Sequence, residues 1–169
     1  SRISDKISHY VTTPRYGTQL ALILVYEQYE QEHKTNKQTA NMNINKYTIK
    51  SQEALQSALE LARRQGQQAL EPAHLLKSLL ELGDSLVDFL LAKLSVSRPR
   101  LEEATDKLIA SLPKVSGGDP YLSSETNKVL DKAEDIASDM KDEYVALEHL
   151  FLALVEVDSP VARLLKSDL

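Results

Sequence analysis

The chain has 169 residues, no cysteine and a formal net charge of −5, and its length allows one domain with a substantial core. The mildly acidic charge argues against nucleic acid as a partner, because phosphate binding needs a basic surface. The absence of cysteine excludes disulfide bonds, a thiol nucleophile and a thiolate zinc site. No apolar run approaches the roughly 20 residues that span a bilayer, so no membrane partner is predicted.

Residues 1–41 differ from the rest of the chain in composition. They combine a Ser- and Thr-rich start, a short apolar run at 20–26 and a polar end. Acidic residues follow the apolar run where a secretory signal would have small residues, so a signal peptide is not predicted. Our interpretation is that 1–41 is upstream or artificially added sequence ahead of a domain at 42–169. The alternative is a genuine extension whose helix, at about 18–32, packs on that domain.

The first half of the domain predicts four helices from its apolar periodicity and its end signals. Thr48 is a plausible N-cap of the first helix, and Gly66 stands where that helix stops. Pro72 lies in the first turn of the second helix, and Pro99 opens the fourth. The predicted ranges are 49–66, 72–83, 85–94 and 99–111. The stretch that follows contains Gly and Pro and is predicted to be a loop.

The second half predicts three helices, at 124–140, at 146–157 and from Pro160 onward. Ser123 is the candidate N-cap of the first of them, in the position that Thr48 has in the first half. Apolar residues at helical spacing on this helix are predicted to be buried: Val129, Leu130, Ala133, Ile136, Ala137 and Met140. Since the first half has four helices, we expect the second half to lack its last helix before the chain ends.

The two halves contain copies of one helical hairpin, 75 residues apart. Residues 55–82 align with 130–157, and the matched positions are the apolar ones. The identical pairs are Leu55/Leu130, Ala58/Ala133, Ala62/Ala137, His74/His149, Leu75/Leu150 and Leu79/Leu154. Such a duplication predicts an all-α domain of two pseudo-twofold repeats, at 47–112 and 121–169. The seam between the repeats is a natural place for a groove.

No motif for nucleotide hydrolysis, zinc proteolysis or serine hydrolysis occurs, so the chain is not predicted to be an enzyme. His74 and His149 lie early in two helices, and no further metal ligand accompanies them. We interpret them as packed histidines that help to cap a helix start, rather than as catalytic or metal-binding groups. Asp142, Glu143 and Glu148 are either solvated acids favoured by a helix dipole or an acidic rim beside a groove.

Three parts of the sequence carry a resemblance to a known family: YTIKSQEALQSALELA with LEPAHLLKSLL, then LPKVSGGDPYLSSETNKVL, then DEYVALEHLFLAL. Together they resemble the Clp N-terminal repeat domain, and the match covers 42–169 in both copies. The inter-repeat loop and the segment KDEYVALEHL resemble the type found in ClpB disaggregases. The resemblance does not extend to residues 1–41.

This resemblance implies the substrate-binding N-terminal domain of a hexameric AAA+ disaggregase in the cytoplasm. Such a domain would bind exposed hydrophobic segments of unfolded or aggregated proteins in the groove between its repeats and hand them to the ATPase ring. The ATPase modules are not in this chain, so ATP and Mg²⁺ are expected in the parent protein and no cofactor is expected here. The hexamer contacts are missing too, and the fragment is expected to be monomeric.

The resemblance also assigns substrate handling to particular residues. The family's Thr at the first helix start, and its Asp and Glu ahead of the second-repeat helix, correspond to Thr48, Asp142 and Glu148. Leu130 would lie by the seam groove. The related ClpC-type domain recognises phosphoarginine through a Glu that precedes the His of each repeat. Here the second repeat keeps Glu148 but the first has Ala73, which argues against phosphoarginine recognition.

Two rival hypotheses stay open. An adaptor-docking domain of a Clp protease ATPase, of ClpA or ClpC type, would bind one folded partner, chiefly through polar surface. A free-standing two-repeat protein would have no ATPase partner. The missing last helix also leaves the outer wall of the groove in question, and the helix at about 18–32 would fill that place if it packs on the domain.

Overall fold

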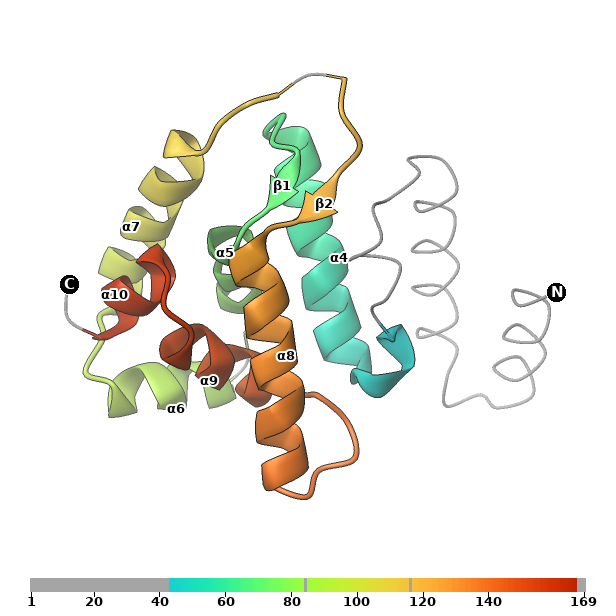
Figure 1. Ribbon diagram of the computed structural model, residues 1–169. Coiled ribbons are helices and arrows are strands. Elements are labelled where there is room, and N and C mark those ends of the chain that lie inside the picture. Colours follow the sequence, from blue (N-terminus) through green and yellow to red (C-terminus); the bar gives the residue numbers. More distant parts are fainter. Residues whose placement is uncertain (1–42, 84, 116, 167–169) are drawn as a thin grey trace, which may run out of the picture.

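The computed structural model describes residues 43–83, 85–115 and 117–166, so the expectations for 1–41 lie outside the described residues. Within these ranges the predicted all-α fold is confirmed, and Figure 1 shows the arrangement of the helices. The helices are α4 (Ile49–Arg64), α5 (Pro72–Leu82), α6 (Ser85–Lys93), α7 (Arg98–Ser111), α8 (Ser124–Asp139), α9 (Leu147–Glu156) and α10 (Pro160–Lys166). A 3-10 helix, η2 (Ile44–Lys46), leads into α4.

Both repeats begin their first helix with the same hydroxyl cap. The Thr48 side chain accepts the backbone N–H of Ser51 at 3.2 Å, and the Ser123 side chain accepts that of Thr126 at 3.1 Å. Each bond satisfies a backbone donor that has no partner within the helix. The sequence signals therefore placed both helix starts correctly.

The first helix of each repeat also ends in the same way. Gly66 follows α4 with φ of +68°, and Lys141, 75 positions later, has φ of +58°. This left-handed turn costs glycine little, whereas lysine adopts it at an energetic cost. The duplication has therefore preserved the backbone path even where the residue type changed.

Two short strands join the repeats, and the sequence did not predict them. β1 (Ala69–Leu70) pairs in parallel with β2 (Tyr121–Leu122), and a single parallel bridge joins Tyr47 to Val145. Each pairing links the segment that enters one repeat to the segment after the first helix of the other repeat. Strands of two residues are too short to show the alternating pattern by which a strand is recognised.

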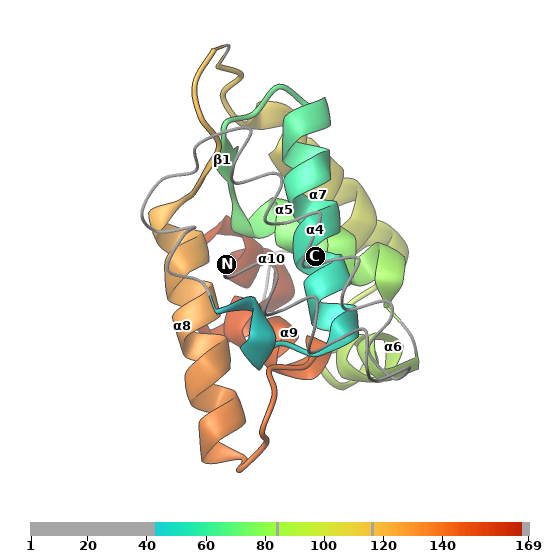
Figure 2. The ribbon, with the colours of Figure 1, turned by 90° about the vertical axis from the view of Figure 1, so that its right-hand side faces the viewer.

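The core lies where α5 and α9 meet, and the leucine-rich faces of both helices are buried there as predicted. Figure 2 shows α4 and α8 standing apart in front of this core, with the strand region above and η2 below. Buried apolar residues include Leu75, Leu76, Leu79, Leu80, Leu150, Phe151 and Leu154. The seam between the repeats therefore runs between α4 and α8.

The prediction that Met140 is buried is wrong. Its side chain is 53 % exposed, because Met140 is the C-cap of α8 and the chain leaves the helix there. Ile136, one turn earlier, is partly buried against the core. The apolar face of α8 therefore ends in a large side chain that is open to solvent.

Candidate functional site

The Tyr47–Val145 bridge brings the start of α4 next to the segment that enters α9. The Thr48 backbone N–H donates to the Val145 carbonyl at 3.0 Å, and the Val145 N–H donates to the Lys46 carbonyl at 2.8 Å. Since Val145 lies three residues from both Asp142 and Glu148 in the sequence, the bridge brings the three predicted polar residues to one end of the seam.

The Thr48 hydroxyl is already engaged within the fold. Besides accepting the Ser51 N–H, it donates to the Ser51 side-chain oxygen at 3.0 Å. The Thr48 side chain is only partly buried, so one side of it faces solvent. Its role as a helix cap is thus part of the structure, and its role toward a substrate stays a prediction.

Asp142 is held by a buried histidine. Its carboxylate lies 2.8 Å from Nε2 of His149, and Nδ1 of the same ring accepts the Ala146 N–H at 2.8 Å. Because Nδ1 is the acceptor, Nε2 carries the proton and donates to Asp142. The His149 side chain therefore caps the start of α9, as the sequence interpretation proposed, and it also orients the Asp142 carboxylate.

The first repeat has the same arrangement without the charge. Nδ1 of His74 accepts the Glu71 N–H at 2.9 Å, and Nε2 lies 2.6 Å from the Gln67 amide oxygen. Burial lowers the pKa of His74 to about 4, since desolvation disfavours the protonated ring. Gln67 occupies the position of Asp142, so a neutral amide in one repeat replaces a carboxylate in the other.

The other two predicted residues differ in accessibility. Glu148 is partly exposed in the first turn of α9, where the helix dipole favours a negative charge. Leu130 is only 5 % exposed on α8, so its side chain presents little surface as the domain stands. The structure thus brings Thr48, Asp142 and Glu148 to one end of the seam, whereas Leu130 is part of the buried core on α8.

Tyr47 is a residue of this end that sequence reasoning missed. Its ring is buried at 1 % exposure, and its hydroxyl is hydrogen-bonded to the Glu134 carboxylate on α8. Burial, the negative charges of Glu134 and Asp131, and this hydrogen bond all raise the pKa of Tyr47 above its usual range. The signal that would have found it is an aromatic residue directly before a helix cap, a position that often packs against the helix.

Two exposed apolar side chains flank the acidic residues. Met140 and Tyr144 lie in the connection between α8 and α9, and Tyr144 is 42 % exposed. Large apolar side chains gathered at a polar rim are typical of surfaces that bind other proteins. This end of the seam can therefore offer an apolar contact, a hydroxyl and two carboxylates to a polypeptide.

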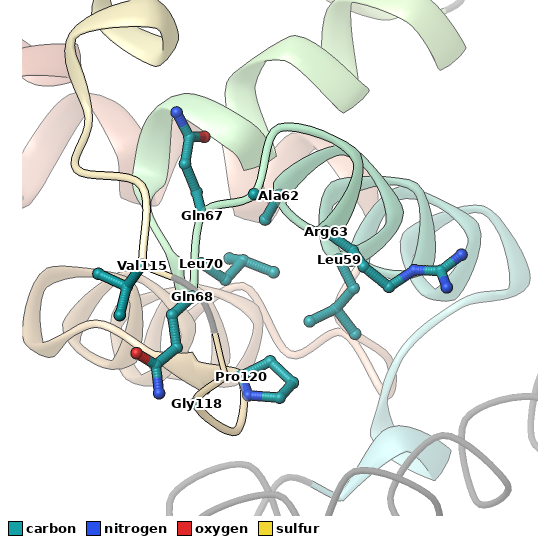
Figure 3. Close-up of a pocket in the computed structure, with 10 residues that line it drawn as sticks. Leu59, Ala62, Arg63, Gln67, Gln68, Leu70, Val115, Gly118 and Pro120 are labelled. Atoms are coloured by element: carbon teal, nitrogen blue, oxygen red, sulfur yellow. The ribbon is translucent and has the colours of Figure 1, made fainter.

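A second feature is an apolar pocket of about 140 Å³ near the strands, which Figure 3 shows with the side chains around it. It lies between the second half of α4, the turn after it and the inter-repeat loop. Its lining residues are Leu59, Ala62, Arg63, Gly66, Gln67, Gln68, Leu70, Val115, Gly118 and Pro120. The pocket could not be predicted from the sequence, because its walls come from segments some 50 residues apart.

Within the described ranges, no group of three or more His, Cys, Asp or Glu residues is arranged to hold a metal ion. No helix in those ranges combines the length and the apolar character needed to cross a membrane.

A family model for the Clp repeat (R) N-terminal domain matches residues 46–168. The chain belongs to this family. The matched span begins at Lys46, the last residue of η2, and ends beyond α10, so it includes the helices of both repeats. The predicted family and the predicted double-repeat fold are both confirmed.

Relatives in the family identify the type of Clp N-terminal domain. The chain is 59 % identical over 125 residues to the chaperone protein ClpB of Porphyromonas gingivalis, which covers 74 % of this chain and 14 % of that protein. It is 50 % identical over 125 residues to the ClpB of Bacteroides thetaiotaomicron, with the same two coverages. The chain thus corresponds to a small part of these relatives and is of the ClpB type.

A solved structure agrees with this assignment. The Hsp104 N-terminal domain from Candida albicans superposes with a TM-score of 0.63 at 25 % identity, covering 70 % of this chain and 78 % of that one. The protein is therefore an N-terminal domain of the ClpB and Hsp104 type of chaperone, a part of those proteins that lies outside their catalytic modules.

Proposed function

We propose that this domain binds exposed hydrophobic segments of unfolded or aggregated proteins at the seam between its repeats. The observation that carries the proposal is the exposure of Met140 and Tyr144 beside Thr48, Asp142 and Glu148. An unfolded client offers aliphatic and aromatic side chains to the apolar pair, while its backbone N–H groups are donors for the carboxylates. Family membership supports the proposal, since the relatives are chaperones.

Binding at this surface is expected to be weak. Each Å² of apolar surface removed from water contributes roughly 25 cal/mol, and ordering a flexible client offsets much of that gain. We therefore expect dissociation constants on the order of tens of μM or higher. Weak binding suits a domain that must release its client, and several copies in one assembly would raise the avidity.

The acidic residues and the histidine have separate parts in this proposal. His149 fixes the Asp142 carboxylate at 2.8 Å, so Asp142 is a pre-oriented acceptor that loses little entropy on binding. Glu148 lies in the first turn of α9 with partial exposure and supplies a second acceptor. Leu130 would contribute only if the client displaces the side chains that cover it.

The step after binding belongs to the parent protein. By analogy with the ClpB type, the client would pass to an ATPase ring of six subunits, and ATP and Mg²⁺ would bind in that ring. The domain itself would act as a monomeric receptor on a flexible position before the ring.

The proposal is tested by NMR titration of the ¹⁵N-labelled chain with a permanently unfolded protein and with the same protein in its folded state. We expect saturable shifts around Thr48, Met140, Tyr144 and Glu148 with the unfolded form only. Shifts with the folded form alone would favour docking of one folded adaptor instead. No chemical-shift changes with either form, in a domain whose signals are well dispersed, would contradict client binding.

A further inference from the structure

The apolar pocket beside β1 is separate from the seam end described above. It is lined by Leu59 and Ala62 of α4, by Leu70 of β1, and by Val115 and Pro120 of the inter-repeat loop. Figure 3 shows Leu59 and Leu70 turned toward each other across it. In Figure 2 the strand region lies above the core and η2 lies below it, so the pocket and the Thr48 end are at opposite ends of the seam.

The pseudo-twofold relation explains why the pocket exists. The segment entering α4 carries two buried apolar side chains, Ile44 and Tyr47. The segment entering α8 has exposed Asp119 and the smaller Leu122 at the corresponding positions. The Tyr47 ring, which belongs to the segment entering α4, reaches across the seam to Glu134 on α8. Leu122, at the corresponding position before α8, is not among the residues that line the pocket beside α4. The face of α8 is thus covered by a side chain from the other repeat, whereas the corresponding face of α4 is open at the pocket.

The size and lining of the pocket suit one apolar side chain. A volume of about 140 Å³ is close to the roughly 150 Å³ of an apolar cavity that holds benzene. The Gln67 side chain contributes no free amide, because it bonds both the Ile109 carbonyl and His74. The Gln68 amide nitrogen donates to the Asp119 carbonyl at 2.6 Å. The polar groups of the lining are therefore largely used within the fold.

The charges around the pocket differ from those of the equivalent surface in the second repeat. The last turn of α4 carries Arg63 and Arg64, and Lys114 stands next to Val115 in the loop. Figure 3 shows Arg63 at the edge of the pocket with its guanidinium turned outward. In the second repeat the positions of the two arginines are held by Ser138 and Asp139. Arg63 is paired with Glu60 at 2.6 Å, and Asp119 lies in the same loop. The cations that this edge offers to a ligand are therefore Arg64 and Lys114, in a chain whose net charge is −5.

We propose that this pocket is a second peptide-binding site, which takes one aliphatic or aromatic side chain from an extended segment with acidic flanking residues. The side chain would occupy the place that corresponds to the one Tyr47 and Ile44 fill at the other end of the seam. The acidic flanks would lie over Arg64 and Lys114, where opposite charge favours association. The inference does not depend on the proposed function at the Thr48 end.

The test is an NMR titration of the full chain with three blocked heptapeptides. One has a central leucine between two aspartates, one has alanine in place of the leucine, and one has lysines in place of the aspartates. The first peptide is expected to give saturable shifts at Val115, Gly118 and Gln68. The other two peptides are expected to bind at least about tenfold more weakly. Equal binding of all three peptides would overturn the assignment.

Two matched variants separate the pocket from general apolar binding. Val115 and Phe89 are exposed to similar extents, at 51 % and 55 %, so a polar replacement at either position is expected to leave the core intact. Val115→Asp is expected to weaken the leucine peptide about tenfold, because it places a carboxylate at the pocket mouth. Phe89→Asp is expected to leave binding unchanged. Equal losses in both variants would contradict the proposal.

The same spectra identify other occupants. Shifts confined to Met140, Tyr144 and Glu148 would overturn the second site and leave the proposed function standing. Pocket signals that move with protein concentration alone would assign the pocket to a second copy of the chain. Peptide binding that appears only after residues 1–41 are removed would assign it to the chain's own N-terminal segment. Either of the last two results would contradict an external peptide as the occupant.

Discussion

The two ends of the seam are built from equivalent segments, yet one is filled and the other is open. At the Thr48 end the Tyr47 ring is buried and bonds Glu134. At the β1 end Leu122 occupies the place of Tyr47, and a pocket of about 140 Å³ remains. The duplication has therefore kept the helix caps and the apolar stripes, while the residues that close the seam have diverged.

The histidines show the same division between conserved geometry and changed chemistry. Both cap a helix start through Nδ1, at 2.9 Å in the first repeat and 2.8 Å in the second. Their Nε2 atoms meet a neutral amide in one repeat and a carboxylate in the other. The capping bond requires a histidine in both repeats. The residue that bonds Nε2 can differ, and with it the charge at the surface.

Removing the side chain that fills one seam end should have the largest effect. Tyr47→Ala is expected to lower the free energy of unfolding by about 3–5 kcal/mol, because it leaves a cavity in a buried site. Tyr47→Phe should cost only about 1 kcal/mol, since it removes the bond to Glu134 and keeps the ring. Urea denaturation measures both. A Tyr47→Ala variant as stable as the parent would show that the filled end contributes nothing.

The pH dependence of stability should reveal His74. Its pKa is lowered from about 6.5 to about 4 by burial, so the unfolded chain binds more protons than the folded chain between these values. Its contribution is therefore full above pH 6.5 and is lost as the pH falls toward 4, by an amount on the order of 3 kcal/mol. Stability measured across this window by denaturation should decline accordingly.

The variant Gln67→Glu tests the same histidine in another way, because it places a carboxylate beside His74, as Asp142 lies beside His149 in the second repeat. A charge beside Nε2 stabilises the protonated ring, so the decline in stability below pH 6.5 should become shallower. The bond from Gln67 to the Ile109 carbonyl is lost as well, which lowers stability. An unchanged slope would contradict the role assigned to His74.

The two hydroxyl caps should differ in function and resemble each other in stability. Thr48→Ala and Ser123→Ala are each expected to cost about 1 kcal/mol. Only Thr48→Ala should also weaken binding of an unfolded client, since Ser123 lies at the other seam end and is buried. Calorimetry on both variants at equal fractions folded separates the effects. Equal losses of client binding would attribute the Thr48 effect to stability alone.

The smallest effect on stability is expected from the exposed apolar residues. Val115→Asp and Phe89→Asp should each change the free energy of unfolding by less than about 0.5 kcal/mol, as surface substitutions usually do. A thermal melt of each variant checks this. A loss above about 2 kcal/mol in Val115→Asp would mean that the inter-repeat loop is part of the core.

The sequence predicted what depends on local spacing. Apolar periodicity placed α4, α5, α8 and α9 within two residues of their observed ends, and the hydroxyl residues before α4 and α8 marked both caps. It also identified the histidines as capping residues, because their equivalent positions in the two repeats are explained by a structural role without catalysis or metal binding. The fold class followed from these patterns, whereas the family was predicted from the resemblance of three stretches of sequence to the Clp N-terminal repeat domain.

What the sequence did not predict depends on contacts between distant segments. The β1–β2 pair and the Tyr47–Val145 bridge join residues about 50 and 100 positions apart, and neither leaves a periodic trace. The exposure of Met140 depends on where α8 ends. The pocket is formed only where α4, β1 and the inter-repeat loop come together, and none of these segments shows it by itself.

The most direct test of the account is the affinity of an unfolded client for the double variant Met140→Ser and Tyr144→Ser. Phe89→Ser serves as the control, because it removes an exposed aromatic side chain from α6. We predict that the double variant binds the client about tenfold more weakly by fluorescence anisotropy, with unchanged thermal stability and an unaffected control. Full client affinity in the double variant, or an equal loss in the control, would contradict binding at this end of the seam.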